Sequence, residues 1–197
     1  MAGVKVLDHE LGFTWVADEG MQRASHALVG DDGRVWLIDP VDDQGVIARA
    51  TARGEVAGVV QLLDRHERDC ARIADRLRVP LHRLPDALPG SPFEVLKVVS
   101  LPVWQERALW WPARRALVVA EAFGTQRAWG AGQPAGVHVM LRLLPPRGLR
   151  AYAPRHLLVG HGAPLHGDGA EAAIPTALAR SWRDLPGAVV RLPSLRP

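Results

Sequence analysis

The 197-residue chain has one cysteine, two lysines and no long apolar segment, and these absences exclude several classes of protein. The single cysteine, Cys70, cannot form an intrachain disulfide and fits a reducing compartment. No segment approaches the roughly 18 consecutive apolar residues of a membrane span, so we expect no membrane association. Residues 1–10 carry three polar residues in a row, at 8–10, and lack the apolar stretch of a signal peptide. The sequence therefore predicts a cytoplasmic protein.

Basic charge is present, but it is dispersed along the chain. The net charge is +3 and the isoelectric point is about 9.7, and Lys5 and Lys97 are the only lysines among 24 basic residues. No run of five or six basic residues occurs, and most arginines stand close to an acidic residue in the sequence. This distribution is typical of solvated helix faces rather than of a phosphate-binding surface. We therefore expect no nucleic-acid partner.

The length and the order of the elements indicate a single domain, 1–197, with room for a substantial core. Apolar, β-prone segments predict strands over 13–16, 25–29, 34–38, 59–63, 93–101, 108–111, 116–119 and 157–159, with a short strand near 81–82. Helical periodicity predicts helices over 43–52, 69–77 and 170–182. The segment 30–33 reads as a hairpin turn, and the glycine-rich segment 124–136 is predicted to be a long loop.

Two polar segments directly follow predicted strands. The segment 64–70 reads Asp-Arg-His-Glu-Arg-Asp-Cys, follows the strand 59–63 and opens the helix 69–77. The segment 160–162 reads Gly-His-Gly and follows the strand 157–159, and 37–40 reads Leu-Ile-Asp-Pro at the end of another strand. Metal-dependent hydrolysis needs a cation held by His, Asp, Glu or Cys, with one position open for water. The first two segments contain residue types suited to such a site.

This layout of strand, polar loop, helix and distant Gly-His-Gly resembles that of the metallo-β-lactamase superfamily, from Leu37 to Gly162. The resemblance implies an α/β (α+β) fold: a four-layer αβ/βα sandwich in which two mixed β-sheets lie between helices. In that family the first loop reads Thr-His-x-His-x-Asp-His, and its side chains hold one or two zinc or iron ions.

The segment 64–70 departs from the family pattern in either alignment. Without gaps only Asp69 matches, and Arg65 takes the place of a histidine. Shifted by one residue, His66 takes a histidine place, but Arg68 takes that of the aspartate. A guanidinium stays charged and cannot bind a cation. In both alignments an arginine therefore enters the metal-binding region, and neither restores a full site.

The resemblance assigns the remaining ligand places by position. His161 corresponds to the last histidine, Glu121 in Ala-Glu-Ala to the bridging acid, and no histidine lies in 100–107, where a third is expected. The candidate metal ligands are thus His66, Asp69, Glu121 and His161, and the candidate catalytic residues are Asp69 and Glu121, which would orient the attacking water.

Each candidate also has a structural alternative that the sequence leaves open. Asp69 stands at the start of a helix, where its carboxylate can cap backbone N–H groups without any metal. His66 is equally compatible with a partly exposed loop histidine, and His161 with a tight turn between glycines. Cys70, which has no evident base partner, is predicted to be a small buried residue.

Two arginines and two tryptophans are candidates for ligand binding. Arg65 and Arg68 can bind an anion bidentately, or they can replace the missing cation and pair with nearby acids. Trp104 and Trp129 fall outside the predicted strands, in segments that rim the pocket in the related fold, and are therefore candidates for the pocket lining.

These observations lead to one prediction and one alternative. The prediction is a metallo-hydrolase-related protein whose eroded site lacks two-metal hydrolysis and binds no cofactor, but binds a small, anionic ligand or a protein partner. The alternative is a hydrolase of an ester, thioester or phosphoester with a single zinc, iron or manganese ion. A homodimer is compatible with both.

Overall fold

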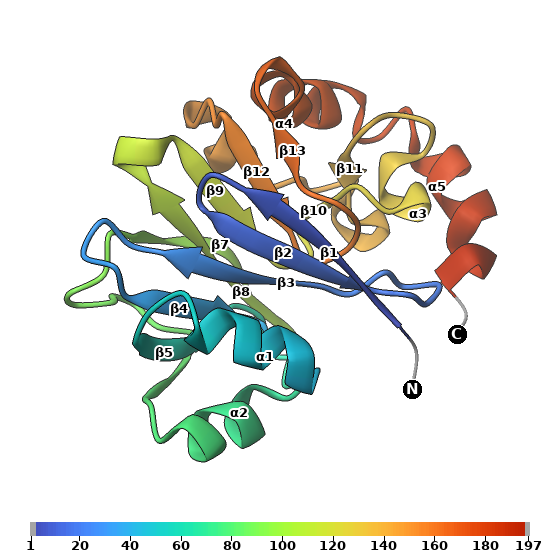
Figure 1. Ribbon diagram of the computed structural model, residues 1–197. Helices are drawn as coiled ribbons and strands as arrows, with labels where there is room; N and C mark the ends of the chain where they lie inside the picture. Colours follow the sequence, from blue (N-terminus) through green and yellow to red (C-terminus); the bar gives the residue numbers. More distant parts are fainter. Residues whose placement is uncertain (1–2, 196–197) are drawn as a thin grey trace.

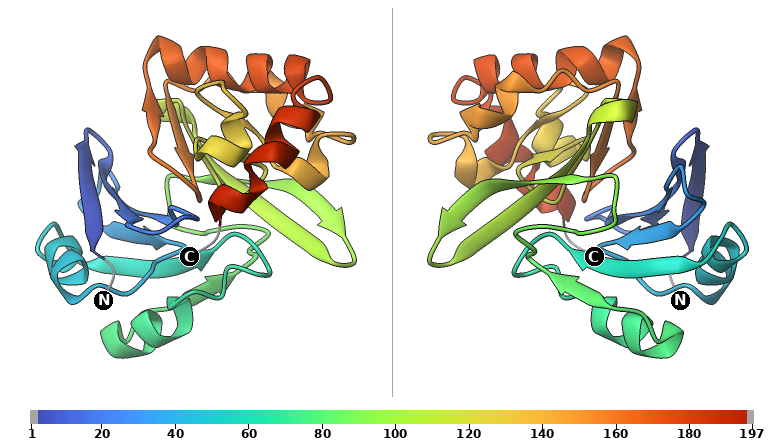
Figure 2. Two further views of the ribbon diagram at one scale, coloured as in Figure 1. Left: turned by 90° about the vertical axis from the view of Figure 1, so that its right-hand side faces the viewer. Right: turned by 90° about the vertical axis from the view of Figure 1, so that its left-hand side faces the viewer.

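A computed structural model describes residues 3–195. Two mixed β-sheets lie between helices, and Figure 1 shows α1 and α2 beside one sheet, α4 beside the other, and α5 next to α3. The two side views in Figure 2 show the same arrangement of layers. This architecture confirms the predicted four-layer αβ/βα sandwich. Within the described residues, no helix is both long and apolar enough to cross a membrane.

The first sheet contains six strands in sequence order. They are β1 (Val4–His9), β2 (Gly12–Ala17), β3 (Ala24–Val29), β4 (Val35–Ile38), β5 (Val56–Gln61) and β6 (Leu81–Arg83). The first four form an antiparallel meander, whereas β4, β5 and β6 are parallel. Parallel neighbours need crossover connections, which α1 (Gln44–Thr51) and α2 (Cys70–Leu77) provide.

The second sheet has the order β13-β12-β9-β8-β7. Its strands are β7 (Glu94–Leu101), β8 (Trp104–Trp111), β9 (Ala116–Val119), β12 (His156–Val159) and β13 (Leu165–His166), and β9 is parallel to β12. Between β9 and β12 the chain forms β10 (Phe123–Gly124), α3 (Arg127–Gly130), β11 (Gly136–Val137) and two 3-10 helices, Val139–Leu141 and Arg147–Ala151. It ends with α4 (Asp168–Arg180), α5 (Leu185–Arg191) and a 3-10 turn, Leu192–Leu195.

Several expectations need correction. The segment 124–136 is not a structureless loop, because α3 lies within it and β10 and β11 pair at its ends. These elements are two to four residues long, too short for a periodic pattern. The sequence interpretation also missed β1 and α5. In addition, the side chain of Asp69 makes no capping hydrogen bond to α2, whereas Asp43 accepts one from the backbone N–H of Val46 in α1.

The core lies mainly between the two sheets, and a second apolar cluster lies between the first sheet and its two helices. Large buried side chains in the first cluster include Trp36, Trp104 and Trp111. Burial of a large apolar side chain stabilises the fold by about 1.5–3 kcal/mol. This packing fixes both sheets and therefore the relative positions of their strand ends.

Four strand ends bring the polar segments together. The residue Asp39 follows β4, the segment 62–69 follows β5, the turn 120–122 follows β9, and 160–162 follows β12. The strands β4 and β5 are parallel in one sheet, and β9 and β12 are parallel in the other. Ligand sites in such folds commonly form at the carboxyl ends of parallel strands. The polar residues singled out in the sequence therefore gather at one edge of the sandwich.

Candidate metal centre

Three side chains from three strand ends converge at this edge: His66, Glu121 and His161. Their ligand atoms all lie within 4.8 Å of one another. His66 Nε2 lies 3.2 Å from Glu121 Oε1, His161 Nε2 lies 3.5 Å from the same oxygen, and the two Nε2 atoms are 3.3 Å apart. Within residues 3–195 no other group of three histidine, cysteine or acidic side chains converges in this way. We call these three residues the triad.

The distances within the triad match those between ligands of a tetrahedral metal ion. Zinc binds histidine nitrogen and carboxylate oxygen at about 2.0–2.2 Å, so neighbouring donors in a tetrahedron stand roughly 3.3 Å apart. The three separations in the triad, 3.2, 3.3 and 3.5 Å, are close to that value. Three protein ligands with a fourth position left for water is the arrangement of catalytic zinc sites.

The outer nitrogens of both histidines are already occupied. His66 Nδ1 donates to Asp39 Oδ2 at 3.1 Å, and His161 Nδ1 donates to the backbone carbonyl of Met21 at 2.9 Å. When these rings are neutral, the proton of each therefore resides on Nδ1, and Nε2 presents a lone pair to Glu121. Two imidazole lone pairs and a carboxylate oxygen thus face one another, an arrangement that calls for a cation or a proton between them.

The two carboxyl groups that contact the histidines are ionised. Burial raises the pKa of Glu121, but the contacts with His161 and His66 outweigh this effect and hold that pKa well below its usual range. For Asp39, burial likewise raises the pKa, and the contact with His66 prevails, so that the pKa is lowered. Burial lowers the pKa of His161, which keeps that ring neutral and able to act as a ligand.

Arg68 lies against the triad and is fixed by three backbone carbonyls. Its Nη1 donates to Ala24 O at 2.5 Å and to Asp39 O at 2.8 Å, and its Nη2 donates to Gly160 O at 3.0 Å. Nη2 also lies 3.5 Å from His66 Nε2. The guanidinium therefore occupies the space beside the triad on one side and places a positive charge there.

Arg65 covers the triad from the solvent side. Its Nη2 donates to Glu121 Oε2 at 2.9 Å and its Nη1 donates to Val103 O at 3.3 Å. The guanidinium carbon lies 4.1 Å from the centroid of a Trp104 ring. The side chain is 42% exposed, whereas that of Glu121 is 12% exposed. Arg65 is thus the outer member of the ion pair.

The two tryptophan candidates support the site from beneath. Trp129 lies in α3, stacks on the His161 ring with centroids 4.7 Å apart and planes 12° apart, and donates from Nε1 to Glu121 O at 3.0 Å. The prediction that Trp104 lies outside the strands is wrong, because it begins β8. Both tryptophans are 2% exposed, so neither presents an open surface to a ligand.

A buried acid that the sequence interpretation missed holds the turn that carries Glu121. Glu106 Oε1 accepts hydrogen bonds from the backbone N–H groups of the turn 120–122 at 2.9–3.1 Å, and Oε2 accepts one from Trp104 Nε1 at 3.1 Å. Burial raises the pKa of Glu106 to about 7, while these four donors favour its ionised form. An acid within the apolar pattern of β8 was the signal available in the sequence.

We expect Glu106→Gln to lower the free energy of unfolding by about 2 kcal/mol. The amide carbonyl can still accept from the turn 120–122, but the amide N–H group would face the Trp104 indole N–H, leaving a buried donor unpaired. Chemical denaturation measures the loss. The control is Glu94→Gln on the exposed edge of β7, expected within about 0.5 kcal/mol of the wild type. A Glu106→Gln protein as stable as the wild type would contradict this role.

Asp69 and Cys70 lie outside the triad. Asp69 Oδ2 accepts from the backbone N–H of Asp42 at 2.7 Å, and Oδ1 accepts from Arg72 at 2.6 Å. The carboxylate therefore joins the loop after β4 to α2 and does not reach the triad. Cys70 is buried, its Sγ lies 3.7 Å from His66 O, and burial raises the pKa of its thiol. A thiol in this state is a poor nucleophile.

Asp39 is the other residue that the sequence interpretation left out of the site. The sequence identifies it only as the acid that ends a strand before Pro40. Its two carboxylate oxygens contact different elements: Oδ1 accepts from the backbone N–H of Leu62 at 2.9 Å, and Oδ2 contacts His66. An acid at the end of an apolar strand, followed by a proline, was the available signal, since β4 and β5 end at the same edge.

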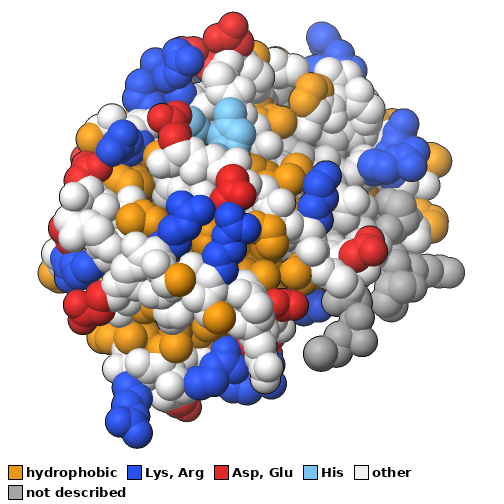
Figure 3. All heavy atoms as spheres, in the orientation of Figure 1, with side chains coloured by type: hydrophobic (Ala, Val, Ile, Leu, Met, Phe, Trp, Pro, Cys, Tyr) orange, Lys and Arg blue, Asp and Glu red, His pale blue; other side chains and the backbone are white. Residues whose placement is uncertain are grey.

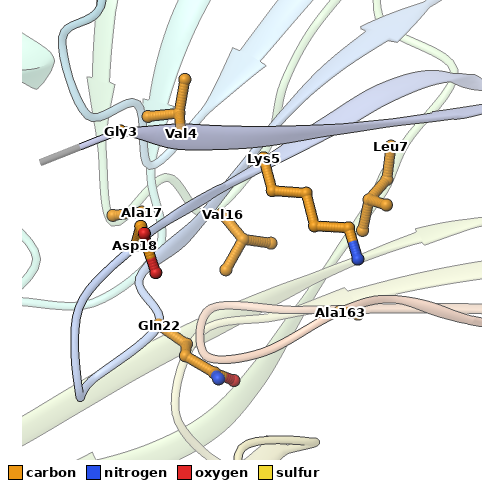
Figure 4. Close-up of a pocket in the computed structure, with 9 residues that line it drawn as sticks. All are labelled: Gly3, Val4, Lys5, Leu7, Val16, Ala17, Asp18, Gln22 and Ala163. Carbon is orange, nitrogen blue, oxygen red and sulfur yellow. The ribbon is translucent and has the colours of Figure 1, made fainter.

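Other surface features lie apart from the triad. A hollow of about 390 Å³ between β1, β2 and the loop after His161 is lined by residues that include Lys5, Asp18 and Gln22 but none of the triad (Figure 4). On the face shown in Figure 3, basic and acidic side chains are interspersed rather than gathered into one basic surface. Neither feature supplies an alternative group of metal ligands.

Comparisons with known proteins identify the fold. No family model and no curated protein sequence matches the chain. Among solved structures, DIM-1 metallo-β-lactamase exposed to ceftazidime aligns with a TM-score of 0.68 and 12% identity, over 96% of this chain and 99% of that chain. A metallo-β-lactamase from Pontibacter korlensis aligns with a TM-score of 0.59 and 12% identity, over 93% of each chain.

A third structure, TTHA1623 in a di-iron-bound form, aligns with a TM-score of 0.52 and 15% identity, over 74% of this chain and 90% of that chain. At such identities the likeness shows the fold alone. The chain has the metallo-β-lactamase fold that its sequence motifs resemble.

Proposed function

We propose that the protein binds one divalent metal ion through His66, Glu121 and His161 and acts as a single-metal hydrolase. The observation that supports this most directly is the convergence of two imidazole lone pairs and an ionised carboxylate at tetrahedral ligand spacing. Of the two functions that the sequence left open, this geometry favours the alternative with one metal ion. The structures with the same fold include a di-iron-bound protein, which supports metal binding by a protein of this fold.

The residues around the triad have separable roles in such a reaction. A bound divalent ion supplies a Lewis acid and lowers the pKa of water toward 7. Asp39 and the Met21 carbonyl hold the two imidazoles in the tautomer and orientation that a metal ligand needs. Arg68 and Arg65 place positive charge beside the triad. This charge stabilises the negative charge that develops on a carbonyl or phosphoryl oxygen during hydrolysis.

Strained backbone surrounds the triad, which supports a functional role. Gln22, Asp39 and Arg68 all have positive φ, at 49°, 44° and 41°. Such conformations are costly for residues other than glycine and persist where the surrounding structure imposes them, often at functional sites. Here Gln22 follows Met21, whose carbonyl orients His161, and the other two residues contact the triad directly.

The decisive experiment is elemental analysis of protein purified without tag metals or chelators, repeated after addition of zinc, iron and manganese. We expect one equivalent of metal in the wild type and almost none in His161→Ala. The matched control is His82→Ala, a histidine of β6 outside the triad, which is expected to keep full occupancy. The metal-loaded protein is then assayed on ester, thioester and phosphoester substrates, with chelator treatment as the negative control.

Two results would count against the proposal. If the wild type binds no metal under any of these conditions, the single-metal hydrolase is wrong and the metal-free ligand-binding protein remains. If His161→Ala retains a full equivalent, the ion is held elsewhere and the triad is not the site.

A further inference from the structure

We infer that Arg65 forms an anion-binding subsite next to the triad, so that the substrate carries an oxyanion group, a carboxylate or a phosphate, beside the bond to be hydrolysed. This inference rests on the proposed function, because it assigns a substrate class to the same centre. It concerns a different residue, however, and it can fail while the metal centre stands.

The first support is the exposed position of the guanidinium. Arg65 has five N–H donors, and its two terminal nitrogens donate to the Val103 carbonyl and to Glu121. Its side chain is 42% exposed beside the largely buried Glu121, so a ligand can reach it from solvent. A guanidinium with two adjacent N–H groups matches the geometry of a carboxylate or phosphate.

The second support is the rigid platform beneath the guanidinium. Trp104 lies 4.1 Å from the guanidinium carbon, is itself buried, and is held by its indole bond to Glu106. Stacking on an aromatic ring fixes the plane of an arginine, and a side chain that is already ordered loses less entropy when it binds a ligand. Arg65 is therefore better prepared for anion binding than a mobile surface arginine.

The third support is the charge balance of the centre. Without a metal, the carboxylates of Asp39 and Glu121 balance the guanidinium groups of Arg65 and Arg68. A divalent ion would add two positive charges, and Glu106, whose oxygens accept four N–H donors, offsets at most one. An ion on Glu121 Oε1 would also draw charge from that carboxylate and weaken its bond to Arg65. Both effects favour the entry of an anion against Arg65.

Inorganic phosphate is the first probe, and isothermal titration of the zinc-loaded protein measures its affinity. We expect Arg65→Ala to weaken phosphate binding about ten-fold or more, with Arg65→Lys intermediate. The matched control is Arg114→Ala, since Arg114 also pairs with a carboxylate, that of Asp31, and also lies over a tryptophan ring, that of Trp111. This variant is expected to bind phosphate as the wild type does. Acetate titrations under the same conditions distinguish a carboxylate subsite from a phosphate subsite.

Zinc occupancy of the same samples separates this inference from the proposed function. We expect Arg65→Ala to hold zinc at least as tightly as the wild type, because the loss of the arginine frees Glu121. Weaker anion binding together with unimpaired zinc binding supports the subsite. Equal phosphate affinity in zinc-loaded Arg65→Ala and wild type means that phosphate contacts the metal alone, and it overturns the inference while the metal centre remains. Absence of zinc from the wild type overturns the proposed function itself.

Discussion

The Arg68→Ala variant is expected to be about 3 kcal/mol less stable than the wild type. The guanidinium connects the ends of three strands, because its three carbonyl partners belong to Ala24 in β3, Asp39 after β4 and Gly160 after β12. Removal of the side chain leaves a cavity and weakens the link between the two sheets at the site. Chemical denaturation measures the loss. Arg72→Ala is the control, since Arg72 is 63% exposed on α2 and its ion pairs are worth at most about 1 kcal/mol.

The same variant is expected to bind zinc more tightly, by roughly ten-fold or more, because a positive charge beside the triad repels a cation. Arg68 Nη2 lies 3.5 Å from a triad nitrogen, so the repulsion acts at short range in a buried site. Competition with a fluorescent chelator measures the affinity. Lower stability with higher zinc affinity would establish Arg68 as the replacement for a second cation. Unchanged or weaker zinc binding would contradict that role.

The fold was predictable because its signals are local. Apolar strands, a hairpin turn and polar residues at strand ends are visible in any short window of the sequence, and they place β2 to β5, β9 and β12 at the observed edge. His66 and His161 were found for the same reason, since each directly follows a strand. The very short elements between β9 and β12 escaped this approach, because their positions depend on tertiary contacts rather than on periodicity.

The alignment of the loop after β5 was not decidable from the sequence, for a reason that lies in the backbone. Arg68 has a φ of 41°, and its side chain enters the site, whereas the next residue, Asp69, engages Arg72 and the loop after β4. No residue pattern in the sequence indicates that an arginine adopts a left-handed backbone conformation. The contacts of Glu106 with the turn 120–122 were equally unpredictable, because the sequence shows an acid within a strand but not the groups to which it bonds.

A second large effect is expected from pH, through His26. This residue of β3 is fully buried, its Nε2 donates to Val159 O at 3.2 Å, and its Nδ1 accepts from the Thr14 hydroxyl at 2.8 Å. Burial lowers the pKa of His26 from 6.5 to about 3, and the nearby His9 and Arg68 contribute to this shift. Asp39 opposes it with a smaller effect. Between these two values the unfolded chain binds a proton that the folded chain does not.

The contribution of His26 to the free energy of unfolding is therefore complete above about pH 6.5. It is lost as the pH falls toward 3, by about 1.4 kcal/mol per pH unit. Glu106 contributes with the opposite sign, because its folded pKa is raised, and other buried groups add their own slopes. These contributions are common to the wild type and to His26→Gln. We thus expect the stability of His26→Gln to fall less steeply with decreasing pH, by about 1.4 kcal/mol per unit.

Chemical denaturation at a series of pH values, down to about pH 4.5, gives the slope of stability against pH for the wild type and for His26→Gln. Equal slopes for the two proteins would contradict the prediction. Nitrogen-15 spectra of the histidine rings provide a second measurement that needs no variant. His26 should remain the neutral Nε2–H tautomer throughout this range, since a ring that titrates near its ordinary pKa cannot be a buried group of this kind.

The neutral state matters for the site, because the His26–Val159 bond joins β3 to β12, the strand that delivers His161 to the triad. Protonation of this ring would place an unpaired charge between the sheets and loosen the strand end on which the metal centre depends.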